Sequence, residues 1–217
     1  TKQLGALGSD QWQSLGSAQL RGLSSDQMAG LATDDLGALT SQQLAVLQTA
    51  QLASLTTRQI ASLLSEDIAA LTTAQLHALA TPAMAALDSA DLAALTSAQV
   101  ASLSTDQLLA IETGDLAAMT TDALAGITAA RIAAFSTKQL AALGSDQWQA
   151  LSSAQLRGLS TDQFAGIATD DLGALTTTQL AALQTQQLAA LSTAKIATLL
   201  SEDIAALTNA ELRGLST

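Results

Sequence analysis

Residues 81–104 read TPAMAALD SADLAALT SAQVASLS, three consecutive units of eight residues. In each unit, which we call an octad, the fourth and seventh positions are apolar and the first is Ser or Thr. Counted from Thr1, Ser9 and Ser17 as first positions, the two apolar positions recur in all 27 octads of the 217-residue chain without an insertion or deletion. A repeat this regular takes precedence over any residue-by-residue assignment of structure.

Two simple structures fit this repeat poorly. A continuous α-helix turns about 100° per residue, so eight residues overshoot two turns by roughly 80° and no single apolar face can form. A β-strand would place positions 4 and 7 on opposite faces. The octads are, however, filled with Ala, Gln, Asp and Gly, which are poor strand residues. We therefore expect one very short helix per octad.

Several features mark the start of that helix at position 1. Ser and Thr favour the N-cap, where the hydroxyl accepts a backbone N–H. Pro82 directly follows Thr81, and proline favours the first helical position. Of the 19 acidic residues, 17 lie at positions 2 or 3, where the helix dipole favours negative charge. The predicted N-caps include Ser9, Ser17, Thr33, Thr81, Thr137 and Ser201.

Such short helices cannot persist alone, so neighbouring octads must stack. The sequence predicts an all-α solenoid, a superhelix of very short helices with three or four octads per turn. Small residues at position 6 would let adjacent helices approach, and Gln at position 3 would bridge exposed carbonyls or form ladders, a ligand-binding ladder being the alternative. The apolar positions predict the core, which includes Leu4, Leu7, Trp12, Leu20, Trp148 and Leu215.

The array is expected to form a single domain over residues 1–217. Residues 138–217 match residues 2–81 at 60 of 80 positions on direct comparison. The chain thus holds one block of 17 octads (2–137) and part of a second copy (138–217). A block copied so closely suggests that the chain is a fragment of a longer array.

Composition argues against most chemistry. The chain has no cysteine and one histidine, His77, so we expect no thiolate or multi-histidine metal site, no cofactor and no enzymatic activity. Its net charge of −11 is opposite to that of a nucleic-acid groove. Polar residues interrupt every octad, so we expect no membrane insertion.

Two sets of residues are candidates for binding. Varied residues at position 5 would form an interaction surface if the array binds a partner: Arg21, His77, Arg157 and Arg213. Acidic pairs recur 32 residues apart within each block, and stacked pairs would supply oxygen ligands for Ca²⁺: Asp34–Asp35, Glu66–Asp67, Asp170–Asp171 and Glu202–Asp203. The simpler interpretation of these pairs is compensation of the helix dipole.

The stretches ALTTAQLHALAT (70–81), ALTSAQVASLST (94–105) and ALTTTQLAALQT (174–185) resemble the Leu/Ala/Thr/Gln octapeptide arrays of very large bacterial proteins. Many of those look like secreted or cell-surface proteins, some of adhesin type. The resemblance implies an extracellular or cell-surface location and a non-enzymatic role as rod, stalk or spacer. The alternative is an interaction module that binds a peptide, a glycan or another copy of itself, including end to end.

Overall fold

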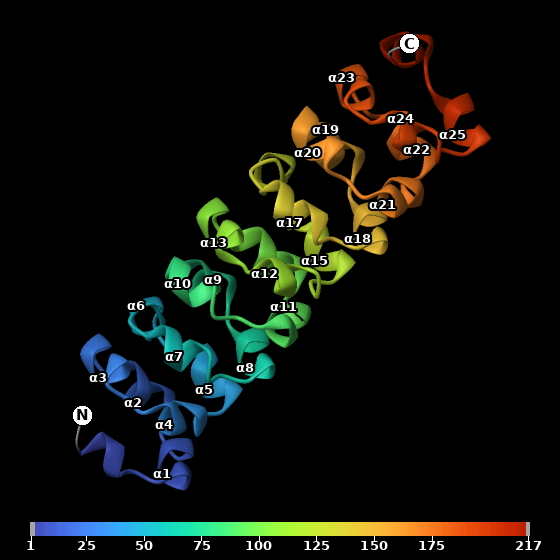
Figure 1. The fold of residues 1–217 in the computed structure, drawn as a ribbon. Helices are drawn as coiled ribbons and strands as arrows, with labels where there is room; N and C mark the ends of the chain where they lie inside the picture. The colour runs from blue at the N-terminus through green and yellow to red at the C-terminus, as the bar shows by residue number, and fades with distance from the viewer. Residues whose placement is uncertain (1–2, 216–217) are drawn as a thin grey trace. The chain divides into compact units, whose positions relative to one another are not determined.

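The computed structural model describes residues 3–215 and consists of short helices throughout (Figure 1). The outermost residues of the predicted array, 1–2 and 216–217, lie outside this range. Residues 3–215 form one 3₁₀ helix and 26 α-helices of four to six residues, with no strand. The predicted all-α solenoid with one short helix per octad is therefore confirmed.

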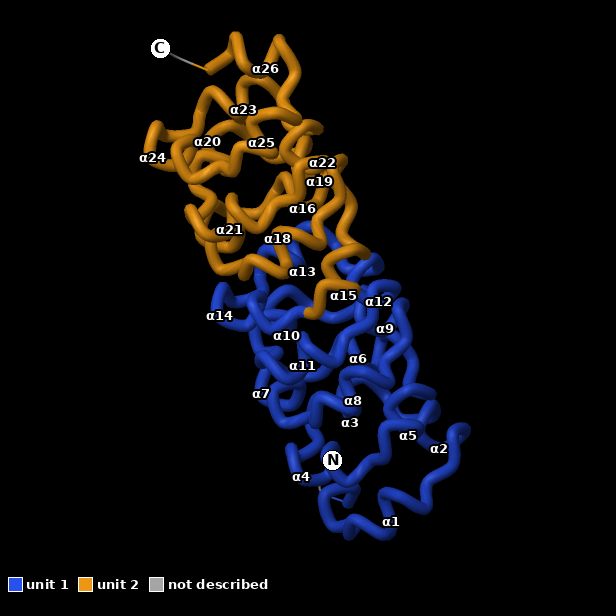
Figure 2. The backbone as a smooth tube through the Cα atoms, turned by 90° about the vertical axis from the view of Figure 1, so that its right-hand side faces the viewer, with its two compact units in different colours: residues 1–119 blue, residues 120–217 orange. Residues whose placement is uncertain are grey.

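The chain divides into two compact units, residues 1–119 and 120–217 (Figure 2). This division lies before the boundary between the two sequence copies at residue 137. Unit 1 contains η1 (Leu4–Ala6), α1 (Ser9–Gln13), α2 (Ser17–Arg21), α3 (Ser25–Ala29), α4 (Thr33–Gly37), α5 (Ser41–Ala45), α6 (Thr49–Ala53), α7 (Thr57–Ile60), α8 (Ser65–Ala70), α9 (Thr73–Ala78), α10 (Thr81–Met84), α11 (Ser89–Ala94), α12 (Ser97–Ser102), α13 (Thr105–Ala110) and α14 (Thr113–Leu116). Unit 2 contains α15 (Thr121–Ala125), α16 (Ala129–Ile132), α17 (Thr137–Ala141), α18 (Ser145–Ala150), α19 (Ser153–Gly158), α20 (Thr161–Ala165), α21 (Thr169–Ala174), α22 (Thr177–Leu180), α23 (Thr185–Ala189), α24 (Thr193–Ile196), α25 (Ser201–Ala206) and α26 (Asn209–Gly214).

Each helix is short because an extended residue at position 8 interrupts the helical backbone before it, and in many octads the residue at position 7 is extended too. Around α9, Thr72 at position 8 has φ −68° and ψ 158°, and Leu79 at position 7 has φ −64° and ψ 138°. Both values lie in the β region. No residue of 3–215 has a positive φ, so the chain leaves each helix without a left-handed glycine.

Helices that pack against each other lie three helices apart in the chain. Within unit 1, α3, α6 and α9 follow one another along one side, and α5, α8 and α11 along another (Figure 1). Side-chain hydrogen bonds between neighbouring turns join residues 25–31 apart, as in Arg21 with Val46 and Gln75 with Leu44. One turn, which we call a coil, therefore spans between three and four octads, as the sequence predicts.

The apolar residues at positions 4 and 7 form the core of each unit. Trp12, Leu20 and Trp148 are completely buried. Leu4, Leu7 and Leu215 are only half-buried, because they lie in the first and last octads and no further described coil covers them. Core burial thus depends on the coils on both sides of a residue.

Glycine at position 6 permits the closest helix contacts, as the small residues there predict. A Cβ added to Gly158 would lie 3.0 Å from the carbonyl oxygen of Ala129, and one added to Gly214 would overlap the Thr185 side chain. These glycines lie where α19 packs against α16 and α26 against α23. A larger residue at either position would push the coils apart.

Candidate functional site

The N-caps lie one residue earlier than predicted, at position 8. Ser9, Ser17, Thr33, Thr81, Thr137 and Ser201 are each the first helical residue, and the cap residues before them are Gly8, Gly16, Ala32, Ala80, Ser136 and Leu200. Where position 8 is Ser or Thr, its side chain usually accepts the N–H of position 3, as Thr72 does from Gln75 at 3.3 Å. The prediction of caps at position 1 is therefore wrong by one residue.

Glutamine at position 3 completes this cap. The Gln75 Oε1 accepts the backbone N–H of Thr72 at 2.8 Å, which makes Thr72 and Gln75 a capping box. The Ser/Thr-x-x-Gln spacing of this box is present in the sequence from position 8 to position 3. A cap at position 1 would require Gln at position 4, where every octad carries an apolar residue. This spacing is the signal that identifies the correct cap.

The other end of the same glutamine side chain joins neighbouring coils. The Gln75 Nε2 donates to the carbonyl oxygens of Leu44, Ala45 and Leu47 at 3.1, 3.2 and 2.9 Å. Equivalent bonds to carbonyls 28–31 residues earlier are made by Gln43, Gln51, Gln59, Gln99, Gln107, Gln155, Gln163, Gln179 and Gln187. We call this double contact the glutamine link. It confirms the predicted bridging of carbonyls by the glutamine amides, but these carbonyls are largely buried rather than exposed.

The glutamine link supplies hydrogen-bond donors to backbone carbonyls at the ends of the short helices. The last carbonyls of a helix have no intrahelical donor, and an octad consists mostly of helix ends. A buried carbonyl without a donor costs about 1–3 kcal/mol. Gln75 is only 2% exposed, so its amide donates to carbonyls such as that of Leu47 inside the protein, where water cannot replace it. The Leu44 carbonyl also accepts the Leu47 N–H at 3.2 Å, so the amide is a second donor there.

Other residues at position 3 keep only part of the link. Asp67, Asp91 and Glu211 are buried, and their carboxylates accept the N–H of their cap residues at 3.2, 3.0 and 2.6 Å. A carboxylate cannot donate to a carbonyl, so the bond to the preceding coil is lost. Lys195 does the reverse, since its Nζ donates to the carbonyl oxygen of Ala165.

Several serine hydroxyls at position 1 donate to the next coil, although they are not caps. The Ser41 Oγ donates to Asp67 Oδ1 at 2.7 Å, and Ser145 donates to Asp171 at 2.8 Å. The Ser25 Oγ donates to the carbonyl oxygen of Ala50 at 3.3 Å. These bonds join an octad to the octad three places further along.

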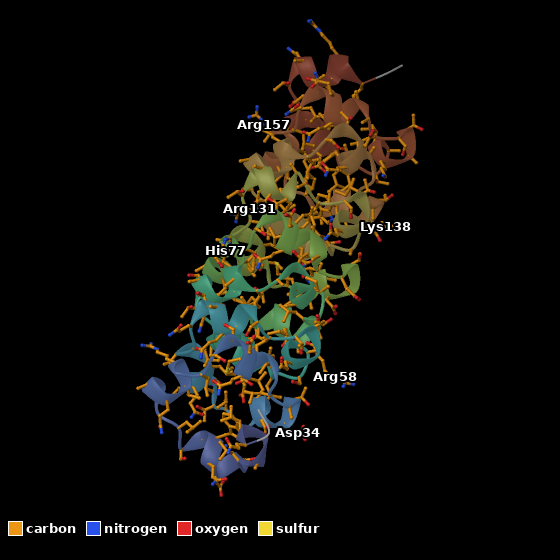
Figure 3. All side chains as sticks on the ribbon, turned by 90° about the vertical axis from the view of Figure 1, so that its left-hand side faces the viewer. Asp34, Arg58, His77, Arg131, Lys138 and Arg157 are labelled. Atoms are coloured by element: carbon orange, nitrogen blue, oxygen red, sulfur yellow. The ribbon has the colours of Figure 1, made fainter. Side chains whose placement is uncertain are left out.

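The predicted interaction residues Arg21, His77, Arg157 and Arg213 are all exposed, and Figure 3 places His77 and Arg157 on the outside of their units. Two of them contact the next coil. The Arg21 Nε donates to the carbonyl oxygen of Val46 at 2.8 Å, and the His77 Nδ1 lies 2.7 Å from that of Ser102. Position 5 therefore supports coil stacking as well as facing solvent.

Beside Arg21 lies a polar cavity of about 250 Å³, lined also by Val46, Gln48, Thr49 and Thr72. The Gln48 Nε2 donates to the Arg21 carbonyl oxygen at 3.4 Å, and Gln184 repeats this bond to Arg157 at 3.0 Å in the second copy. The cavity walls are thus formed largely by groups that join coils.

The acidic pairs do not gather into a metal site. Within residues 3–215, no group of three or more His, Asp or Glu side chains is arranged to hold a metal ion. Likewise, no helix in this range is both long and apolar enough to span a membrane. The Nε1 atoms of Trp12 and Trp148 are buried without a hydrogen-bond partner, as core indoles rather than ligand-binding groups.

The fold and the glutamine links define a helical solenoid repeat protein. A comparison with protein families identifies the repeat further, since the ALTTAQ repeat matches residues 1–33, 28–65, 84–110, 108–145, 124–153 and 164–201. The chain belongs to the ALTTAQ repeat family. A search of curated proteins gave no significant match.

Proposed function

We propose that this chain is a non-enzymatic structural array that serves as a rod, stalk or spacer in a large bacterial surface or secreted protein. The observation that supports the proposal is the glutamine link. It recurs with the same acceptors 28 and 31 residues earlier, as in Gln51 with Leu20 and Leu23. A contact repeated in this way fixes the advance from one coil to the next, so length follows from octad number.

The use of the polar side chains also favours a structural role. Gln at position 3 and Ser at position 1 hydrogen-bond within the array, and His77 is the only histidine. The surface or secreted location rests on the resemblance to bacterial octapeptide arrays.

Small-angle X-ray scattering tests the spacer role. The 217-residue chain is compared with a chain in which residues 2–137 are inserted once more. We expect the cross-sectional radius of gyration to stay constant while the maximum dimension grows in proportion to octad number. A compact particle whose dimensions grow in all directions would overturn the proposal.

The second candidate is an interaction module, and the polar cavity beside Arg21 favours it. The guanidinium NH₂ groups and the Thr49 hydroxyl would suit a carboxylate of a peptide or acidic glycan. A peptide and glycan array tests this. Saturable binding that Arg21→Ala weakens, and that exposed Arg58→Ala leaves unchanged, would favour the module over the spacer.

A further inference from the structure

The arginine at the polar cavity of unit 1 is held in place by the backbone of the next coil. The Arg21 Nε donates to the Val46 carbonyl oxygen at 2.8 Å, and both residues line the cavity of about 250 Å³. The two NH₂ groups of the same guanidinium donate to no described residue. A guanidinium held at Nε presents these donors in a rigid, planar arrangement, which suits a carboxylate.

The exposure of this arginine does not depend on where the array begins. The equivalent Arg157 is also exposed, although its helix, α19, has described helices packed on both sides, namely α16 and α22. Position 5 thus faces solvent in the interior of the array as well. Arg21 therefore stays accessible whether or not further octads precede it.

Two further side chains at the cavity have unused hydrogen-bonding capacity. Thr49 is exposed, and its hydroxyl bonds to no described residue. The exposed Gln48 amide makes one described bond, from Nε2 to the Arg21 carbonyl oxygen at 3.4 Å, which leaves a donor hydrogen and the Oε1 acceptor. The Thr72 hydroxyl, by contrast, already bonds to Gln75. Arg21, Gln48 and Thr49 are hence the groups that a ligand can use.

The charge around the cavity differs from that of the chain as a whole. The chain carries a net charge of −11, yet the octads that supply every lining residue except Thr72 contain no Asp or Glu: residues 17–24, 41–56 and 73–80. Arg21 is the only Lys or Arg in these octads. A carboxylate beside Arg21 therefore gains the attraction of an opposite charge without repulsion from a carboxylate in the cavity wall.

The second sequence copy keeps the arginine but lacks two of these features. Arg157 donates to no described residue, so its guanidinium is not held as that of Arg21 is. Glu211 replaces Gln75 and places a buried carboxylate in the equivalent octad. Gln184 still donates to the Arg157 carbonyl oxygen at 3.0 Å. The two copies thus form a matched pair, of which only the first suits an anionic ligand.

We propose that the cavity at Arg21 binds one uronate residue of an acidic glycan, and that the bound sugar clamps neighbouring coils together. The carboxylate accepts from the Arg21 guanidinium and the Thr49 hydroxyl. The sugar hydroxyls, which both donate and accept, pair with the Gln48 amide. The cavity is slightly smaller than the range of about 300–1,000 Å³ that drug-sized ligands occupy, so it suits one sugar residue. This inference rests on the interaction-module function proposed for the same cavity.

The clamp follows from the origin of the binding residues. Arg21 belongs to octad 3 and Thr49 to octad 7, in successive coils, and the two residues line one cavity only when these coils are stacked. A ligand that contacts both residues binds the folded chain and not the unfolded one, so it stabilises the fold. With a dissociation constant of about 1 mM, about 100 mM uronate should raise the melting temperature by about 5–10 °C.

Differential scanning calorimetry of the full chain tests the clamp, with sodium galacturonate as the probe. The control ligand is galactose in sodium chloride of the same ionic strength, which lacks the carboxylate and should leave the melting temperature unchanged. The rise with galacturonate should disappear in Arg21→Gln and shrink in Thr49→Val. The matched variants in the second copy, Arg157→Gln and Thr185→Val, should respond like the unmodified chain. A rise that Arg21→Gln retains, or that Arg157→Gln removes equally, would overturn the proposal.

Carboxylates without sugar hydroxyls distinguish a glycan from a peptide as the ligand. Acetate and N-acetylaspartate should bind about fivefold more weakly than galacturonate, because they forgo the hydrogen bonds to Gln48. Equal affinities would overturn the assignment to a sugar. Binding on the peptide and glycan array that depends on Arg21, without any rise in melting temperature, would refute the clamp and leave the interaction module standing. A rise without binding on the array would support the clamp and count against the module.

Discussion

The two sequence copies, 2–81 and 138–217, have largely the same residues but bury them differently. Leu76 is completely buried, whereas its counterpart Leu212 is 41% exposed. Gln75 links to three carbonyls of the preceding coil, whereas Glu211 at the same place only caps its own helix. In unit 1, α12 packs on α9, and no described helix packs on α26 in this way. An octad is thus stabilised by its neighbours more than by its own sequence.

The largest difference between the copies should come from truncating the equivalent leucines. Leu76→Ala removes a fully buried side chain and should lower the free energy of unfolding by about 2–5 kcal/mol. Leu212→Ala should cost only about 1 kcal/mol, because much of this side chain is already in water. Urea unfolding at low protein concentration measures both. Equal losses would mean that the coil packed on α9 contributes nothing to the burial of Leu76.

Exchanging the residues at position 3 should reverse the difference in hydrogen bonding between the two copies and change the stability accordingly. Gln75→Glu removes the donors to Leu44 and Leu47 and should cost about 1–3 kcal/mol. The loss should shrink at acidic pH, where a protonated carboxyl can donate. Glu211→Gln should instead gain about 0.5–1.5 kcal/mol, since the carbonyls of Leu180 and Leu183 lie 31 and 28 residues earlier.

Exposed Gln42→Glu, at position 2, is the control for added charge and should change the stability little. Should Gln75→Glu behave like this control, the glutamine links would not be what holds the coils together.

A smaller effect distinguishes the two possible caps. Thr72→Ala should cost about 1 kcal/mol, the usual value for an N-cap, whereas Thr73→Ala should stay within about 0.5 kcal/mol. In the second copy Thr208→Ala and Asn209→Ala should show the same order, because Thr208 is the cap there. Thermal unfolding followed by circular dichroism measures all four. If Thr73→Ala and Asn209→Ala lower the stability more than Thr72→Ala and Thr208→Ala do, the N-cap lies at position 1 after all.

The sequence alone predicts the all-α solenoid because its period of eight fits neither a continuous helix nor a strand. The position of the cap is harder to predict, since Ser and Thr occupy both positions 8 and 1. Only the Thr72-x-x-Gln75 spacing separates these alternatives. The partners of Gln75 cannot be identified from the sequence, because they lie 28–31 residues away and depend on how many octads complete a turn. The incomplete burial of Leu4 and Leu215 is likewise a property of neighbouring coils, which the repeat itself does not reveal.

The smallest expected effect extends the comparison of Gln75 and Glu211 to a third position-3 residue, Asp91. Burial raises the pKa of Asp91 above 3.8, its ordinary value. A backbone hydrogen bond from Asp88 lowers this pKa, whereas the nearby carboxylates of Asp88 and Asp115 raise it further, and the net shift is upward. Between 3.8 and the raised pKa, the folded chain binds a proton that the unfolded chain releases. Stability from this group is therefore greatest below that interval and falls as the pH rises through it.

Asp91→Asn removes this titration and keeps an oxygen that can accept the Asp88 N–H, a bond of 3.0 Å in the native chain. The variant should melt at a higher temperature than the native chain at neutral pH, and the gap should narrow as the pH falls towards 4. Glu66 and Asp67 belong to α8, which packs on α11, so their protonation changes both proteins alike and cancels in the difference. The control is Asp106→Asn at an exposed position, which shows how much the melting temperature changes when one surface charge is lost. A gap that is independent of pH, or that matches the Asp106 variant, would show that Asp91 is hydrated in solution and that burial at position 3 does not penalise a carboxylate.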